Sequence, residues 1–129
     1  MTDHEDTDGR RILVVEDDML IAMSIEEVLL ELGCIVLGPV ARLDQAMQLA
    51  TNEVFDAAIL DVTIRGGQTF PVAERLDERG IPFVLASGYG DWALPKSLQG
   101  RERLTKPFTA NELKIRMQAL CAMAAASSA

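Results

Sequence analysis

The stretch ILVVEDD, residues 12–18, places a continuous apolar run directly before three acidic residues. Apolar runs of similar length recur along the chain at residues 34–37, 57–60, 83–86 and, most weakly, 103–105. Short runs without polar alternation are typical of strands that are buried on both faces of a sheet. The sequence therefore predicts five buried strands.

The segments between these runs have the period of amphipathic helices. Apolar stripes with spacings of three and four occupy residues 21–32, 43–50, 72–76 and 113–124. Gly33 follows the first stripe as a helix-terminating residue, and Thr109 and Glu112 form a capping box before the last stripe. Glycines and a proline interrupt residues 88–102, so the helix expected near residues 92–98 should be short or irregular.

Strands that alternate with helices predict an α/β fold with a parallel sheet covered on both faces. At this length the expected architecture is the doubly wound, flavodoxin-like sheet of five strands in the order 2-1-3-4-5. We expect residues 1–10 to form a disordered N-terminal tail, residues 11–124 to form the domain, and residues 125–129 to form a C-terminal tail.

Length and composition argue against several classes of protein. The chain has 129 residues, of which 49% are hydrophobic, and this suits one folded domain better than a disordered chain. The net charge is -8, and the one basic-looking stretch, residues 101–106, is short, so direct nucleic-acid binding is not expected. Because no apolar run approaches the ~18 residues that span a bilayer, and the polar start lacks a signal-peptide core, we expect a cytoplasmic protein with no membrane partner.

Residues that commonly bind zinc or build a catalytic triad are few. Cys34 and Cys121 stand far apart, among apolar residues and outside any CxxC pair, which favours two reduced core thiols. The only histidine, His4, lies in the polar N-terminal segment. A histidine-based metal site or a Ser-His-Asp triad is therefore not expected.

The carboxyl ends of the predicted strands carry the polar residues. Glu16 and Asp17 follow the first strand, Asp61 the third, Ser87 the fourth and Lys106 the fifth. In a doubly wound sheet these ends meet at the ligand-binding edge. Clustered carboxylates repel one another unless a cation is present, and Mg²⁺ prefers such oxygen ligands together with a phosphate. A carboxylate can also act as the nucleophile that forms an aspartyl phosphate. An ammonium would neutralise charge on the phosphoryl group, and a hydroxyl would donate a hydrogen bond to one of its oxygens.

Each of these residues also has a simpler interpretation. Asp17 and Asp18 could cap the first helix, Asp61 could be a turn residue, and Lys106 could be a surface charge. The metal and phosphate interpretation is favoured because several strand ends supply its parts together.

Two further pairs stand near the predicted edge. Gly66 and Gly67 fit no phosphate-binding motif and are interpreted as a flexible turn beside Asp61. Tyr89 and Trp92, the only tyrosine and tryptophan, could be loop anchors or part of a partner surface.

Together these features resemble response regulator receiver domains of the CheY-like type over about residues 11–124. The matching stretches are ILVVEDD (12–18), AAILDV (57–62), FVLASGYG (83–90) and LTKPF (104–108). The fourth strand is similar to that of a subgroup of single-domain receivers with a Phe-Ala-Thr-Gly motif, which is associated with sensor histidine kinases of alphaproteobacteria.

The resemblance implies a role for each strand-end residue. Asp61 would be the phospho-acceptor, Ser87 the switch hydroxyl, and Lys106 the family's lysine, with a cis bond to Pro107. The implied ligands of a Mg²⁺ ion are Glu16, Asp17, Asp61 and the main-chain carbonyl of Thr63.

The implied function is that of a single-domain response regulator that accepts a phosphoryl group from a sensor histidine kinase. It would hydrolyse the group slowly, without being a turnover enzyme, and would signal to an unknown downstream protein as a monomer or weak dimer. The alternatives are a phosphorylation-independent binding module and a small aspartate-dependent phosphatase, although Thr63 stands where that chemistry usually has a second Asp. The chain departs from the family at Arg65, where many receivers have Pro, and at Arg103, where an aromatic switch residue is typical.

Overall fold

The computed structural model describes residues 6–88 and 95–128, and a parallel five-stranded sheet forms its centre. The sheet strands are β1 (Arg11–Val15), β2 (Ile35–Val40), β3 (Ala57–Asp61), β6 (Phe83–Ser87) and β7 (Arg103–Thr105). Their spatial order is β2-β1-β3-β6-β7, which confirms the predicted order 2-1-3-4-5. All five residues of β3 are buried, as a strand covered on both faces requires.

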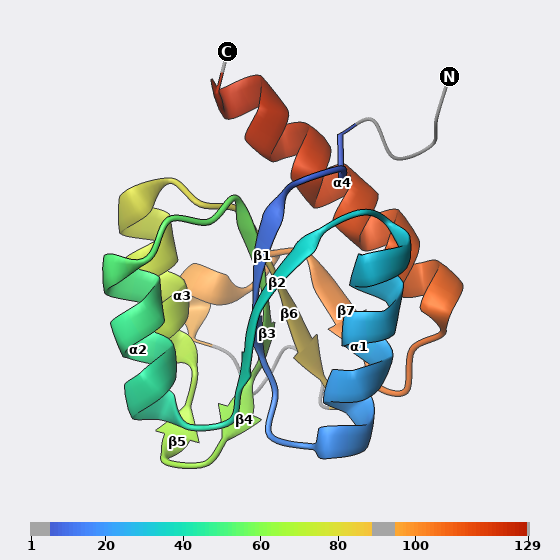
Figure 1. Ribbon diagram of the computed structural model, residues 1–129. Coiled ribbons are helices and arrows are strands. Elements are labelled where there is room, and N and C mark those ends of the chain that lie inside the picture. Colours follow the sequence, from blue (N-terminus) through green and yellow to red (C-terminus); the bar gives the residue numbers. More distant parts are fainter. Residues whose placement is uncertain (1–5, 89–94, 129) are drawn as a thin grey trace.

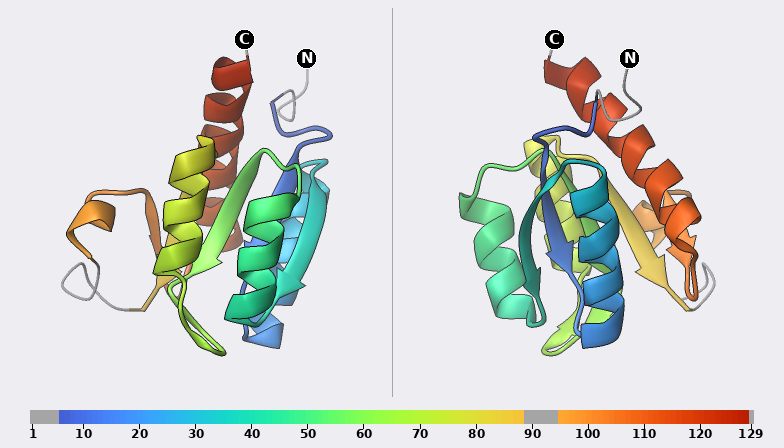
Figure 2. Two further views of the ribbon diagram at one scale, coloured as in Figure 1. Left: turned by 90° about the vertical axis from the view of Figure 1, so that its left-hand side faces the viewer. Right: turned by 45° about the vertical axis from the view of Figure 1, so that its right-hand side comes forward.

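The helices cover both faces of the sheet, as Figures 1 and 2 show. They are α1 (Met19–Glu31), α2 (Leu43–Asn52), α3 (Phe70–Arg79) and α4 (Ala110–Ser128). On one face α2 and α3 pack over Leu13 and Val15, and on the other α1 and α4 pack over Ile12 and Val14. The alternating residues of β1 therefore contribute to two separate apolar cores. None of these helices, among the residues described, is long and apolar enough to cross a membrane.

The predicted helix ends are present. Gly33 follows α1 with a positive φ of 83°, which is the left-handed conformation typical of a helix-terminating glycine. At the start of α4, the Glu112 N–H donates to Thr109 Oγ1 at 3.0 Å, and the Thr109 N–H donates to Glu112 Oε1 at 2.9 Å. This reciprocal pair is the capping box expected from the sequence.

The segment after Asp61 forms a hairpin that the sequence did not indicate. Its strands are β4 (Thr63–Ile64) and β5 (Gly67–Gln68), which pair antiparallel. The hairpin is tied to the connection between β2 and α2, because the Leu43 N–H donates to the Arg65 carbonyl at 2.9 Å. A Cβ atom on Gly66 would lie 3.2 Å from the Leu43 Cβ atom. The two glycines thus belong to a hydrogen-bonded hairpin rather than to a flexible turn.

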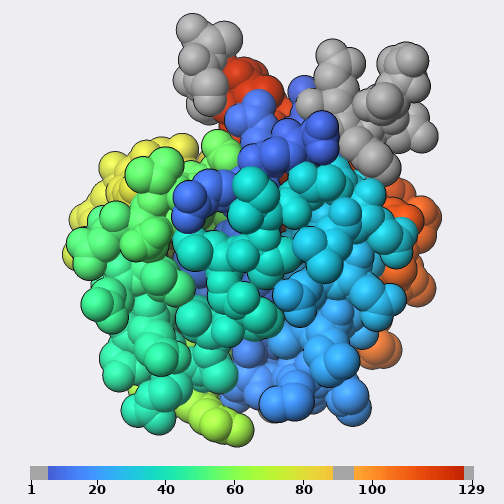
Figure 3. All heavy atoms as spheres, in the orientation of Figure 1, coloured from blue at the N-terminus to red at the C-terminus, as the bar shows by residue number. Residues whose placement is uncertain are grey.

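In the parts of the two chain ends that the structure describes, residues 6–10 and 125–128 are ordered rather than tail-like. Residues 6–10 form a turn that packs on the end of α1, where the Thr7 hydroxyl donates to the Leu32 carbonyl at 2.7 Å. The Gly9 N–H donates to the Gly33 carbonyl at 2.8 Å. These donors satisfy carbonyls that a helix end leaves without partners, which explains why the segment is ordered. Figure 3 shows it lying over the turn between α1 and β2. At the other end, the alanine-rich sequence extends α4 to Ser128.

The irregular segment before β7 is only partly described. Among the described residues of this segment, a 3₁₀ turn, η2 (Lys96–Leu98), stands where a short or irregular helix was predicted, and its Leu98 side chain is buried. Residues 89–94, and with them Tyr89 and Trp92, lie outside the described residues.

Candidate functional site

The predicted strand-end residues gather at the carboxyl edge of the sheet, which is the lower edge in Figure 1. Glu16 and Asp17 follow β1, Asp61 ends β3, and Lys106 follows β7. The ammonium of Lys106 lies 2.9 Å from Glu16 Oε1 and 3.2 Å from Asp61 Oδ2. Three different strands therefore bring their charged residues together, as the doubly wound architecture predicts.

The two carboxylates beside Lys106 are withdrawn from solvent. Glu16 is 3% exposed and Asp61 is 8% exposed, whereas the Lys106 side chain keeps 20% of its surface. Glu16 Oε2 also accepts a hydrogen bond of 3.0 Å from the Asp18 N–H. Buried charges are costly unless they are paired, and here one ammonium is shared between two carboxylates.

This imbalance changes the protonation of Asp61. Burial, followed by the charge and hydrogen bond of Glu16, raises the pKa of Asp61 to about 7, against the opposing effect of Lys106. Burial lowers the pKa of Lys106, but its hydrogen bond to Glu16 and the charge of Asp61 outweigh that effect and raise it. The site is therefore short of positive charge, and a further cation would relieve the repulsion.

A metal ion fits the carboxylate oxygens. Glu16, Asp17 and Asp61 each offer one oxygen, and these atoms lie within 4.8 Å of one another. Glu16 Oε1 is buried and receives no well-aligned hydrogen bond, although the Lys106 ammonium is close. An all-oxygen set of this kind suits a hard divalent cation such as Mg²⁺ and offers zinc neither nitrogen nor sulfur.

Asp17 and Asp18 have different surroundings, although they are adjacent and both acidic. Asp18 is the N-cap of α1, and its Oδ1 accepts from the N–H groups of Leu20 and Ile21. Asp17 is the partly buried member of the carboxylate cluster. The capping interpretation therefore holds for Asp18, and the metal-ligand interpretation suits Asp17.

The remaining predicted residues lie around this cluster. The Thr63 N–H donates to Asp61 Oδ1 at 3.4 Å. Ser87 ends β6 beside β3, and its carbonyl accepts from the Lys106 N–H at 2.9 Å. The bond between Lys106 and Pro107 is cis, as expected. Arg103 begins β7 opposite Leu85 of β6.

Thr69 contributes to the site but was not identified from the sequence. It stands at the N-cap of α3, yet its side chain makes no capping bond there. Instead its buried hydroxyl donates to the Asp61 carbonyl at 2.7 Å and approaches the Val62 carbonyl at 3.3 Å. Thr69 thus holds the main chain of the residue that carries the central carboxylate. A threonine before a helix predicts a cap, so no local signal indicated this contact.

Several known proteins are similar to the chain. SdrG from Sphingomonas melonis Fr1, known from a solution structure, is 38% identical; the match covers 89% of this chain and 97% of that one, with a TM-score of 0.74. The receiver domain of the sensor histidine kinase PA1611 from Pseudomonas aeruginosa PAO1 has been solved with a magnesium ion coordinated in its active-site cleft. It is 25% identical over 88% of this chain and 98% of its own, with a TM-score of 0.72.

Curated relatives are longer than this chain. The uncharacterised transcriptional regulatory protein YbdJ of Bacillus subtilis is 30% identical over 116 residues, which are 85% of this chain and 50% of YbdJ. The chain spans about half the length of the curated relatives it matches. The family model of the response regulator receiver domain matches residues 12–118. The protein therefore belongs to the response regulator receiver family of two-component signalling.

Proposed function

We propose that Asp61 accepts a phosphoryl group from a phosphohistidine of a sensor histidine kinase, with the help of Mg²⁺. The observation that carries the proposal is the position of Lys106, whose ammonium lies 3.2 Å from Asp61 Oδ2 within a cluster of three carboxylates. The magnesium ion of the PA1611 receiver domain supports the choice of metal. Its proposed ligands here are Glu16, Asp17, Asp61 and the main-chain carbonyl of Thr63.

The residues of the site divide the chemistry between them. A carboxylate oxygen of Asp61 attacks the phosphorus atom, and the bond from phosphorus to the histidine nitrogen breaks, with its electron pair remaining on nitrogen. Lys106 neutralises charge on the phosphoryl oxygens, and the Ser87 hydroxyl donates to one of them. When bound, Mg²⁺ would neutralise the carboxylates and the phosphoryl group, and would hold Asp61 in its ionised, nucleophilic form.

The acyl phosphate is the signal in this proposal. It adds a charge of about -1.5 to -2 at the sheet edge and is lost by slow hydrolysis, so the protein catalyses its own modification rather than steady turnover. The signal then passes to a downstream protein by direct contact. The proposed responsive part is residues 88–103, of which the structure describes residue 88 and residues 95–103 with η2, because this segment connects Ser87 to the strand that precedes Lys106.

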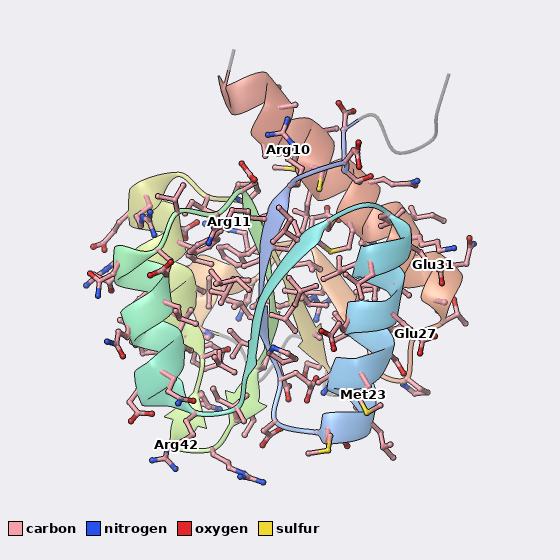
Figure 4. The ribbon with its side chains drawn as sticks, viewed as in Figure 1. Arg10, Arg11, Met23, Glu27, Glu31 and Arg42 are labelled. Carbon is pink, nitrogen blue, oxygen red and sulfur yellow. The ribbon has the colours of Figure 1, made fainter. Side chains whose placement is uncertain are left out.

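Exposed apolar residues next to the site suit a kinase helix. Met19, Leu20 and Met23 on the first turns of α1 are 75%, 77% and 56% exposed, and Figure 4 shows Met23 on the outer surface of that helix. Beside them lies a mostly apolar hollow of about 300 Å³, lined by Ile21, Ser24, Lys106, Pro107 and Phe108. An apolar helix face docks into such a surface, and from there a phosphohistidine would be close to Asp61.

Acetyl phosphate tests the acceptor without a kinase. Incubation with acetyl phosphate and Mg²⁺ should add about 80 Da, one phosphoryl group, to the wild type and to the exposed-residue control Asp18→Asn. Asp61→Asn should remain unmodified, and equal labelling of this variant would refute the assignment. Steady hydrolysis of a phosphomonoester would instead indicate a phosphatase. An unchanged NMR spectrum on adding Mg²⁺ with beryllofluoride would indicate a binding module that does not use phosphate.

A further inference from the structure

Two cysteines that are distant in sequence meet on the face of the sheet covered by α1 and α4. Cys34 directly precedes β2, and Cys121 lies in the second half of α4. Both are free and belong to one buried apolar cluster, with exposures of 4% and 0%. The two thiols are neighbours within this cluster, since each is the leading influence on the pKa of the other. From the sequence, the two cysteines were interpreted as separate core thiols, because they become neighbours only when the chain folds.

We propose that Cys34 and Cys121 form a reversible intramolecular disulfide when a small hydroperoxide reaches them. The pair has the arrangement that such chemistry needs, because the two neighbouring thiols come from different segments, the turn after α1 and the second half of α4. A disulfide would link the turn after α1 to the second half of α4. The inference is independent of the proposed phosphoryl chemistry, since Cys34 lies before β2 at the end of the sheet opposite Asp61.

The two sulfur atoms differ in reactivity. The Cys121 thiol can donate to the sulfur of Cys34, and this hydrogen bond lowers the pKa of Cys34. The same hydrogen bond, together with burial, raises the pKa of Cys121. Since the thiolate is the nucleophile in such reactions, Cys34 is the sulfur that reacts first and Cys121 the one that resolves the product.

The proposed oxidation balances with one hydroperoxide molecule. The Cys34 thiolate attacks one peroxide oxygen, the oxygen–oxygen bond breaks, and the leaving hydroxide takes up a proton to give water. The sulfenic acid on Cys34 is then attacked by the Cys121 sulfur, and its oxygen leaves as a second water molecule with the Cys121 proton. Two thiols are oxidised by two electrons and the peroxide is reduced, so no further reactant is needed.

Residues 6–10, which we call the N-terminal strap, cover Cys34. The Cys34 thiol donates to the Thr7 carbonyl at 3.4 Å, and the buried Thr7 hydroxyl fixes the strap to the Leu32 carbonyl at 2.7 Å. A Cβ atom on Gly33 would overlap with Asp8 Oδ1, so the strap packs directly on the turn after α1. Because the strap lies near the N-terminus and its Thr7 carbonyl accepts from the Cys34 thiol, its local opening would uncover Cys34 and is the proposed route of entry for the oxidant.

Peptide mapping tests the disulfide directly. The reduced full chain is treated with about one equivalent of hydrogen peroxide, quenched with catalase, denatured and alkylated with N-ethylmaleimide. We expect a peptide linking residue 34 to residue 121, a loss of about 2 Da from that pair, and full reversal by dithiothreitol. Mapping is needed because exposed methionines such as Met19 and Met123 also take up oxygen from peroxide.

The variants make the result specific. Cys34→Ser should abolish the cross-link and leave Cys121 open to alkylation, and Cys121→Ser should leave Cys34 as a trapped sulfenic acid. Recovery of two alkylated thiols from oxidised wild type, or a disulfide found only between separate chains, would overturn the proposal.

A strap variant tests the route of entry. Thr7→Ala removes the hydroxyl that fixes the strap, and should speed disulfide formation about fivefold or more through easier local opening. Thr51→Ala removes an exposed threonine on α2, and should leave the rate unchanged. Equal rates in both variants would overturn the role of the strap. Neither threonine belongs to the Asp61 site, so labelling by acetyl phosphate reports separately on that site.

Discussion

The ammonium of Lys106 lies 3.2 Å from Oδ2 of Asp61, and this pair joins the ends of β7 and β3 across the intervening strand β6. The same ammonium lies 2.9 Å from Glu16. Lys106 is therefore the shared partner of two buried carboxylates, and its removal affects both.

Replacing Lys106 should destabilise the metal-free protein. In Lys106→Ala, Glu16 and Asp61 lose their shared ammonium, and at pH 8 we expect unfolding to become easier by about 2–3 kcal/mol. The measurement is urea denaturation in EDTA. Lys114→Ala is the matched control, because Lys114 pairs with Glu31 at 2.9 Å but the two side chains are 37% and 57% exposed, and its loss should cost less than about 0.5 kcal/mol. Equal losses would mean that the buried cluster has no special electrostatic role.

Asp61→Asn should stabilise the metal-free protein in a pH-dependent way. The pKa of Asp61 rises from 3.8 to about 7 on folding, so the folded protein binds more protons between these values. The stability contributed by Asp61 is therefore present below about pH 4, falls as the pH rises to about 7, and stays low above it. Asparagine removes this dependence.

At pH 8 we expect the free energy of unfolding of Asp61→Asn to be about 2 kcal/mol larger than that of the wild type. The full shift in the pKa of Asp61 would give a ceiling of roughly 4 kcal/mol. At pH 4 the two proteins should be nearly equal. Urea midpoints in EDTA at both pH values measure this, and a difference that does not vary with pH would contradict it.

Asp17 and Asp18 should differ in their effect on Mg²⁺ binding. Asp17→Asn removes a proposed ligand and should weaken the affinity about tenfold or more. Asp18→Asn removes the same charge but preserves the helix cap, since asparagine caps as well as aspartate, and should change the affinity by less than about twofold. Titration calorimetry measures both affinities. Equal weakening would indicate that only net charge matters.

The buried hydroxyl of Thr69 should contribute more to the stability of the fold than the exposed hydroxyl of Thr51. Thr69→Val keeps the shape but leaves the Asp61 carbonyl without this donor, which should cost about 1–2 kcal/mol. Thr51→Val is the control, since the Thr51 hydroxyl bonds to the Met47 carbonyl at 2.7 Å on an exposed helix face, and should cost less than about 0.5 kcal/mol. Thermal unfolding of the two variants decides between these expectations.

The apolar surface on α1 should affect phosphotransfer from a kinase but not labelling by acetyl phosphate. Leu20→Asp should lower the rate of phosphotransfer about tenfold and leave labelling by acetyl phosphate unchanged. Leu30→Asp places the same charge on an exposed part of α1 farther from the site, and should have little effect. The kinase can be identified by phosphotransfer profiling against the host's histidine kinases. Loss of labelling by both donors would point to damage to the site itself.

The fold and the central charged residues could be predicted from the sequence because their signals are local. Each strand is a short apolar run, and Asp61 and Lys106 directly follow such runs, so the topology alone brings them together. Thr69, the β4–β5 hairpin and the strap could not be predicted. Their defining bonds join segments that meet only after folding, as in the contact between Thr7 and Leu32. The same reason explains why the contact between Cys34 and Cys121 was missed.

The hairpin that follows Asp61 has a consequence for ligand affinity. Its cross-strand pairing and its bond from Leu43 to Arg65 fix the main chain around Thr63 while the protein folds. An arriving ion or phosphate then has no disordered loop to immobilise at this position, so little conformational entropy opposes its capture. The affinity for an ion or phosphate at this edge should accordingly depend more on ionic strength and on the charges of the site than on the stiffness of the surrounding backbone.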